Sequence, residues 1–238
     1  MTAPPLAAGF GLFGDAFNFV FNKQEAETGG VLVGGLGQIG ELAAKQLEVT
    51  VLALGVAILL ALPAGLLLGH FGKGEFVAVS AGNAGRAIPE LALIALMATA
   101  VGVGLFNLVV ALAILGIPPI LTNTFVGIRQ VDSSSVEAAK GMGMTNREII
   151  TKVELPLAIP TIMGGVRTAS INIIATATIA PLAGILTLGD LIISRNVYGD
   201  AGVLAGAILV ALMAITIEGL LAGVQWRLTP RGLKLQRS

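Results

Sequence analysis

Long runs without formal charge constrain this chain more than any other feature of its sequence. Positions 49–69 and 91–128 contain no Asp, Glu, Lys or Arg. A membrane-spanning helix needs about 20 consecutive apolar residues, so the first run suffices for one crossing and the second is too long for one. Charged residues make up 12% of the chain, against about 25% in soluble domains. These observations predict an all-α integral membrane protein.

The spacing of the charges predicts five membrane-spanning helices within a membrane domain over 49–226. The expected spans are 49–69, about 76–101, about 105–128, about 156–184 and about 201–225. We expect His70 to lie in a polar turn after the first span, 185–200 to form an external loop, and 227–238 to form a basic cytoplasmic tail.

The first 48 residues are expected to be external or interfacial. Residues 36–48 place apolar side chains at roughly helical spacing, which favours a helix on the membrane surface that leads into the first span. Residues 9–21 hold five Phe but also Asp15 and Asn18, and they are too short to span a bilayer. For residues 1–30, an interfacial anchor helix and a disordered tail stay open as alternatives.

One polar, charge-dense stretch, 132–156, interrupts the apolar sequence. Ser134 with Glu137, and Thr145 with Glu148, have the spacing of two capping boxes, in which the cap hydroxyl and the Glu carboxylate each accept a backbone N–H. Gly143 lies between them, where a left-handed residue ends a helix. Pro156 disfavours helical geometry at the residue before it. The stretch therefore predicts two short helices joined by a glycine turn, outside the membrane.

The same stretch resembles the EAA loop of ABC importer permeases. The matching residues are Glu137, Ala138, Ala139, Gly143, Val153, Leu155 and Pro156, with Val153 where Ile is commoner. The resemblance implies a type I ABC importer permease fold with cytoplasmic coupling helices, and it assigns residues 129–156 to contact with an ATPase. Glu137 also has a plainer interpretation as a helix cap.

The wider run, from Asn123 to Met144, resembles the osmoprotectant branch, whose substrates are glycine betaine, carnitine and choline. This resemblance implies three partners: cytoplasmic ATP-binding subunits, a second permease of the same or a homologous chain, and an extracytoplasmic substrate-binding protein. The chain has no Gly-x-x-x-x-Gly-Lys-Ser/Thr phosphate loop. We therefore expect no cofactor and no enzymatic activity on this chain, with ATP hydrolysis on a partner.

Basic residues predict the orientation in a bacterial inner membrane. If the 129–155 loop is cytoplasmic, nine Lys and Arg lie on the inner side and three on the outer. Because Lys and Arg are enriched in cytoplasmic loops, five spans with the N-terminus outside and the C-terminus inside are favoured. Trp226 is then an anchor at the inner interface.

Polar residues within the spans are candidates for the substrate pathway. Arg86 and Glu90 are four apart and suit a pair on one helix face, which we favour over substrate contact. Asn172 and Thr176 suit either a pore lining or a bridge to another helix, with the bridge slightly favoured. Ionisable groups in spans usually face a partner or water, and this applies also to Arg167 and Glu218.

Two Gly-x-x-x-Gly motifs, at Gly65 and Gly202, suit close helix packing in lipid. Prolines at positions 63, 89, 118 and 119 are expected to interrupt or bend the spans. One Trp and one Tyr cannot form the aromatic cage that suits a quaternary ammonium group, so recognition is expected on a partner.

Other functions remain as alternatives. An ion-coupled secondary carrier is disfavoured by the absence of an obvious inverted repeat, and a non-transporting membrane anchor does not require the prolines and polar groups in the spans. An ABC permease for another small polar solute, such as an amino acid, is a further alternative. Zero net charge gives no support to a nucleic-acid partner, and no Cys with one His gives none to a metal site. We expect membrane lipid to surround the spans.

Overall fold

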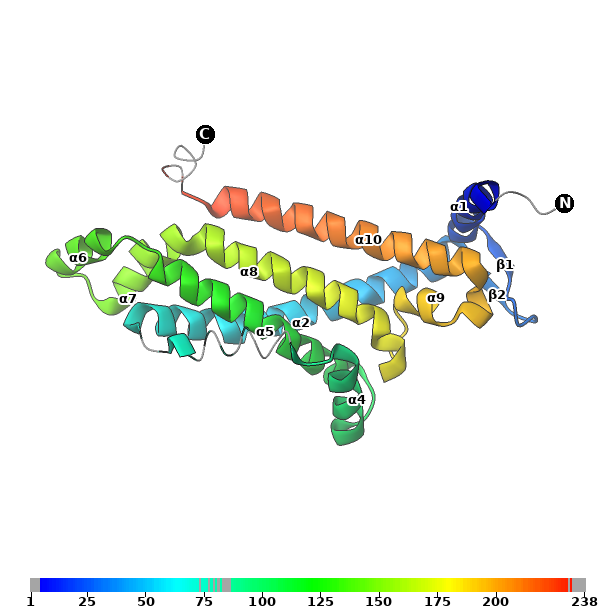
Figure 1. Cartoon of the computed structure of the whole chain (residues 1–238), viewed down its shortest axis with the longest axis horizontal. Coiled ribbons are helices and arrows are strands. Elements are labelled where there is room, and N and C mark those ends of the chain that lie inside the picture. Colours follow the sequence, from blue (N-terminus) through cyan, green and yellow to red (C-terminus); the bar gives the residue numbers. More distant parts are fainter. Residues whose placement is uncertain are drawn as a thin grey trace.

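The chain is almost entirely helical (Figure 1). The computed structural model describes residues 5–72 and 87–230, together with positions 74–76, 78, 80, 82 and 232. In these parts of the chain the order is α1 (Pro5–Phe21), β1 (Lys23–Glu25), β2 (Leu32–Gly34), α2 (Gly35–Phe71), α4 (Glu90–Val101), α5 (Leu105–Arg129), α6 (Ser133–Gly141), α7 (Asn146–Ile149), the π-helix η1 (Ile150–Glu154), α8 (Leu155–Thr176), the 3₁₀ helix η2 (Ala177–Ala183), α9 (Gly189–Ile193) and α10 (Arg195–Leu228).

Four helical segments in the described residues are long and apolar enough to cross a membrane. They are Gly35–Phe71, Leu105–Arg129, Asn146–Ala183 and Arg195–Leu228, and they contain four of the five predicted spans. The remaining one, 76–101, lies partly outside the described residues. Its described end is the 12-residue helix α4, which projects away from the long axis of the molecule (Figure 1).

Helix α5 forms the centre of the molecule, between α2 and α8. The α2 side depends on glycine: a Cβ at Gly65 would lie 2.6 Å from the Thr124 Cβ, and one at Gly69 would lie 2.7 Å from the Ile128 Cβ. The first Gly-x-x-x-Gly motif therefore lets two backbones approach closely, as predicted. Leu108 and Leu112 of α5 and Ile173 of α8 are fully buried in the adjoining apolar core.

Residues 36–48 do not form a separate surface helix, contrary to our prediction. They are the first turns of α2, which continues without a break to Phe71. Ile39, Leu42 and Gln46 are buried, so the apolar spacing reflects packing against protein. This segment is therefore a direct extension of the first spanning helix and not a separate helix on the membrane surface.

The N-terminal alternatives resolve as a helix followed by a hairpin. Helix α1 packs along α10, and Phe19 is fully buried with its ring edge-on to Tyr198. Strands β1 and β2 pair antiparallel at the end of the molecule opposite α6 and α7 (Figure 1). The hairpin was not predicted, since its strands have only three residues each.

The predicted external loop, 185–200, is largely helical. It contains α9 and the first turn of α10, which bends at Gly199, with φ 63°. Tyr198 Oη donates to Asp190 Oδ2 at 2.6 Å, which fixes the bend against α9. At Gly206, the second motif glycine, a Cβ would lie 2.8 Å from the Leu191 Cβ, so close packing is confirmed there too.

The prolines differ in their effect. Pro63 lies inside α2, and Pro118 and Pro119 lie inside α5. Contrary to the expectation of an interruption, both helices continue through these prolines. Pro89 is extended, with ψ 117°, and precedes the first residue of α4. The span predicted over 76–101 is therefore broken at this proline.

Candidate coupling loop and membrane pathway

Helix α6 begins differently from our prediction. It starts at Ser133 after Asp132, whose backbone carbonyl accepts from Ser135 N at 3.1 Å. The capping box predicted at Ser134 is therefore wrong. Ser134 lies within the first turn, and its hydroxyl donates to the Asp132 carboxylate, which lowers the pKa of Asp132 below its ordinary value. The residue at the helix start is Asp132, two positions before Ser134, and it follows directly on the turn that ends α5.

The glycine turn and the second capping box are confirmed. Gly143 has φ 79°, and Met144 N donates to Ala139 O at 3.2 Å, which closes α6 in the manner of a left-handed helix end. Thr145 N donates to Glu148 Oε2 at 3.1 Å and Glu148 N donates to Thr145 Oγ1 at 3.4 Å. Both orphan donors at the start of α7 are satisfied.

Pro156 does not end the helix that begins after Thr145, contrary to our prediction. The chain passes from α7 through η1 into α8, and Leu155 keeps helical angles, with φ −58° and ψ −50°. In η1 the Leu155 N–H donates to Ile150 O, five residues earlier. This wider turn relieves the clash of a proline ring with the preceding backbone, so α7 and the membrane span form one connected rod.

The residues of the EAA pattern come together at one end of the molecule, where α6 contacts η1. Ala139 is buried, whereas Glu137 and Ala138 are exposed. Val153, Leu155 and Pro156 are half-buried, and Leu155 packs against the cluster of Ile128, Ala158 and Ile162. In the neighbouring turn, Met142 is 74% exposed. One alanine therefore anchors the loop while its neighbours present an accessible surface.

A buried polar pair below this loop was missed at the sequence level. His70 Nδ1 lies 2.8 Å from Glu154 Oε2, and both side chains are 5% exposed. The pair joins the last turn of α2 to η1, so His70 is not in the polar turn that we expected. Glu137 and Lys140 line the adjoining hollow of about 250 Å³. A separation of 84 residues leaves no local signal for the pair.

The residues predicted for the substrate pathway, Arg86, Glu90, Asn172 and Thr176, do not lie together in one site. Arg86 lies outside the described residues, so its pairing with Glu90 stays a prediction. Thr176 Oγ1 donates to Glu90 Oε2 at 2.7 Å, which is the bridge to another helix that we favoured for Thr176. Asn172 is exposed and lines a hollow between α5 and α8.

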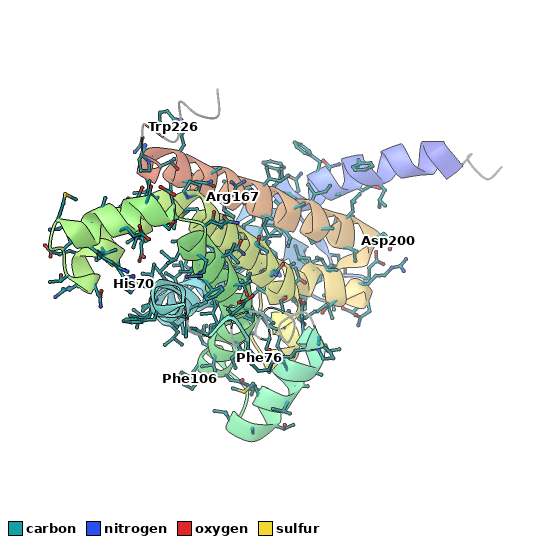
Figure 2. All side chains as sticks on the ribbon, turned by 60° about the vertical axis from the view of Figure 1, so that its left-hand side comes forward. His70, Phe76, Phe106, Arg167, Asp200 and Trp226 are labelled. Carbon is teal, nitrogen blue, oxygen red and sulfur yellow. The ribbon has the colours of Figure 1, made fainter. Side chains whose placement is uncertain are left out.

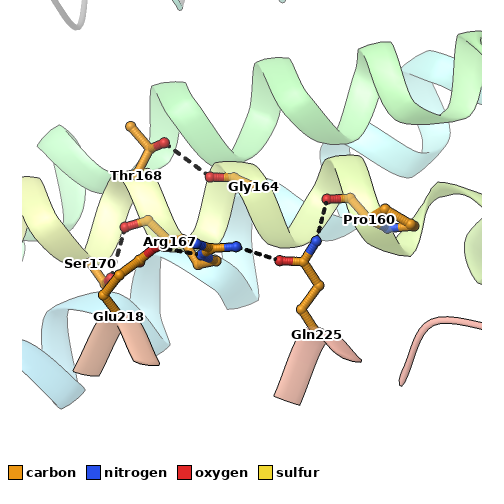
Figure 3. A network of polar contacts seen from close by, with 7 residues as sticks. All are labelled: Pro160, Gly164, Arg167, Thr168, Ser170, Glu218 and Gln225. Atoms are coloured by element: carbon orange, nitrogen blue, oxygen red, sulfur yellow. Dashed lines mark hydrogen bonds and ion pairs between the residues drawn. The ribbon is translucent and has the colours of Figure 1, made fainter. Parts of the chain in front are cut away.

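Arg167 and Glu218 form an ion pair between α8 and α10 (Figure 3). Arg167 Nε of α8 donates to Glu218 Oε1 of α10 at 2.7 Å, and Arg167 Nη1 donates to Gln225 Oε1 at 2.8 Å. Gln225 Nε2 in turn donates a hydrogen bond to the carbonyl oxygen of Pro160 at 3.3 Å. Figure 2 shows Arg167 between these helices, with Trp226 towards one end of α10 and Asp200 at the other. The ionisable groups in these spans thus face partners, as expected.

Comparison with known proteins defines the class. Residues 50–230 match the family model of the binding-protein-dependent transport system inner membrane component. The chain belongs to this family of ABC transport permeases and is a multi-pass membrane protein.

Curated relatives narrow the resemblance. The chain is 39% identical over 82% of its length, and 92% of theirs, to the choline transport system permease protein OpuBB and to the glycine betaine/carnitine/choline transport system permease protein OpuCB, both of Bacillus subtilis. It is 35% identical to the osmoprotectant import permease protein OsmY of Salmonella typhimurium, covering 79% of this chain and 81% of the relative.

A solved structure supports the fold. A chain of the MetNI methionine ABC transporter in inward-facing conformations superposes with a TM-score of 0.72 at 20% identity, covering 82% of this chain and 98% of that one. At this identity the likeness shows the type I permease fold alone, which agrees with the fold class predicted from the EAA pattern.

Proposed function

We propose that this chain is the permease of an ATP-driven importer for quaternary ammonium osmoprotectants such as glycine betaine, carnitine or choline. One observation carries the proposal: the chain is 39% identical, over most of its length, to permeases of choline and of glycine betaine/carnitine/choline transport systems. A permease for an amino acid is the second candidate, and its support is limited to the fold shared with a methionine transporter.

The exposed part of the 129–156 loop is the proposed contact with the ATPase. Glu137 and Ala138 are exposed on α6 while Ala139 is buried beneath them, so the helix can dock on a partner without losing its own packing. The continuous rod from α7 through η1 to α8 would carry a displacement of the loop into the membrane. In this proposal cytoplasmic ATP-binding subunits bind the loop, and a second permease of the same or a homologous chain completes the pathway.

Recognition of the substrate is proposed to lie mainly on an extracytoplasmic binding protein. Tyr198 is buried, with its hydroxyl bonded to Asp190, so the one tyrosine is committed to holding α9 and α10 together. The sequence supplies one Trp, Trp226, on the other end of α10 (Figure 2). The two rings are therefore too far apart in the fold to form one cage.

Uptake into vesicles tests the proposal. Vesicles holding this permease with its ATPase are supplied with labelled choline, glycine betaine, carnitine and methionine, with and without the binding protein. We expect ATP-dependent uptake of at least one quaternary ammonium solute, and only with the binding protein present. Uptake of methionine alone would support the second candidate instead.

Labelling of single cysteines tests the proposed orientation, with the loop and C-terminus inside and the N-terminus outside. The chain contains no native cysteine, so Ser135→Cys and Asp200→Cys each introduce one thiol. In intact cells a membrane-impermeant maleimide should label Asp200→Cys and leave Ser135→Cys unlabelled until the membrane is opened. Labelling of Ser135→Cys from outside would invert the proposed topology.

A further inference from the structure

A polar hollow of about 190 Å³ lies between the middle portions of α5 and α8. It is lined by Gly82, Leu115, Pro118, Pro119, Thr122, Asn123, Thr168 and Asn172. A single water needs about 10–15 Å³ of such space, so a small organic headgroup fits with water around it. Within a membrane span, an exposed stripe of polar side chains requires water or a polar ligand.

The described lining is polar without formal charge, and its hydroxyl hydrogens are used within the protein. Thr122 Oγ1 donates to Ala78 O at 2.9 Å, and Thr168 Oγ1 donates to Gly164 O at 3.0 Å. Each hydroxyl oxygen then keeps lone pairs and no proton for a ligand. Asn123 Nδ2 donates one of its two hydrogens to Pro119 O at 2.8 Å.

The tandem proline adds further acceptors to the same wall. Proline has no N–H, so Pro118 and Pro119 leave the carbonyls four residues earlier in α5 without their usual helical donors. One of these carbonyls belongs to Leu115, which itself lines the hollow. A break in helical hydrogen bonding at membrane depth is tolerated where it lines a cavity.

We propose that this hollow is a transit site for the cationic headgroup of the transported solute. A quaternary ammonium group has no N–H to donate, so it gains from oxygen dipoles around it and needs no hydrogen-bond acceptor at a fixed angle. Dipoles in place of a carboxylate attract the cation weakly, which suits passage because a full ion pair would retain it. The inference rests on the proposed function in taking an organic cation as cargo.

Charge-selective labelling tests the site without relying on transport. Thr168→Cys is made in the complete complex in vesicles, and its reaction rates with a cationic and an anionic methanethiosulfonate of similar size are compared. The rates of both reagents with free 2-mercaptoethanol correct for their intrinsic reactivity. We expect the corrected rate to favour the cation about tenfold, the factor given by about 1.4 kcal/mol, and choline to slow the reaction.

Two variants at Asn172 supply the matched transport test. Asn172→Lys should abolish choline uptake by repulsion. Asn172→Asp, of similar size to Asn but with a negative charge, should let the cation enter and slow its release, so that choline uptake is reduced but not lost. Both should assemble with the ATPase as the parent does. Equal corrected rates for the two reagents, no reaction at Thr168→Cys, or equal uptake by the two charged variants would each overturn the transit site. If the parent complex imports no quaternary ammonium solute, the proposed function fails instead, while the labelling ratio still reports on the hollow.

Discussion

The central helices and α10 are held in the molecule by different forces. In the apolar window of α5, 50% of the residues are buried, against 11% in that of α10. Helices α2, α5 and α8 meet through glycines and small side chains at van der Waals distance. Helix α10 is attached to α1 and α9 at one end and to α8 by the Arg167–Glu218–Gln225 contacts. The centre is therefore packed along its whole length, whereas α10 is packed against apolar side chains at one end and joined to α8 by polar contacts farther along.

The 129–156 loop belongs with α10 in this respect. Of α6, only Ala139 is buried, and the loop keeps its form through the turn at Gly143 and the capping box at Thr145. A substitution in the centre should therefore prevent folding, whereas one in α10 or in the loop should alter attachment or coupling. Each prediction below tests one part of this difference.

The largest effect is expected at Gly165 of α8. A Cβ there would lie 2.6 Å from the Asn123 Cβ and 2.6 Å from Pro119 O, and neither α5 atom can move without shifting the backbone. Gly165→Val should remove most of the detergent-stable protein, since overpacking a dense core costs about 1–3 kcal/mol or more. Gly219→Val in α10 is the control, because a Cβ there meets nothing within 4 Å. Loss of Gly219→Val as well would show that a partner packs closely on α10.

The next effect is expected at the attachment of α10. Glu218→Leu leaves Arg167 without its carboxylate inside a span. An unpaired Arg costs at most about 2.5–3.5 kcal/mol at the centre of the bilayer, and because the Arg167 side chain is 32% exposed we expect a smaller loss than at Gly165. The double variant Arg167→Leu with Glu218→Leu removes both charges and should regain much of the lost thermal stability. A double-mutant cycle in detergent measures the coupling. Additive losses would mean that the two side chains do not stabilise each other.

A smaller effect on stability, but a clear one on coupling, is expected at Gly143. Its φ of 79° is strained for a β-branched residue by about 1–3 kcal/mol, so Gly143→Val should misplace α7 relative to α6 while the spans still insert. The ATPase should co-purify less well, and substrate-stimulated hydrolysis should fall. Gly141→Ala is the matched control, since a Cβ there meets nothing within 4 Å and Ala favours a helix. Normal transport by Gly143→Val would remove the loop as the coupling element.

Local signals in the sequence predicted local structure well. The turn at Gly143 and the box at Thr145 depend on residues within five positions of each other, so both could be inferred. The family fold followed from the EAA pattern and the apolar runs. The pairings of His70 with Glu154 and of Arg167 with Glu218 join positions 84 and 51 apart in the chain. The position of Arg167 and Glu218 within apolar runs indicates that each needs a partner, but only the packing of α8 against α10 decides which partner it is. For His70 there is no such indication in the sequence.

Two errors share one physical origin, which is that longer packed elements override a short pattern. Residues 36–48 have the spacing of a surface helix, yet their apolar side chains pack against protein because α2 continues through them. Pro156 resembles a helix end, yet the π-turn before it lets the rod continue. In both cases the local sequence is compatible with two structures, and the protein adopts the one in which the helix continues.

The smallest effect distinguishes the two helix starts of the loop, which the sequence presents as equivalent. Thr145→Ala removes a hydroxyl that accepts from Glu148 N, and loss of such a cap costs about 0.5–2 kcal/mol. Ser134→Ala removes a hydroxyl that donates to the exposed Asp132 carboxylate and caps no backbone N–H, so its cost should be close to zero. Hydrogen exchange of the amides over 145–149, compared with those over 133–137, measures each change in its own helix. We expect faster exchange in α7 of Thr145→Ala and unchanged exchange in α6 of Ser134→Ala. Equal acceleration in both would restore the symmetric pair of capping boxes and contradict the start of α6 at Asp132.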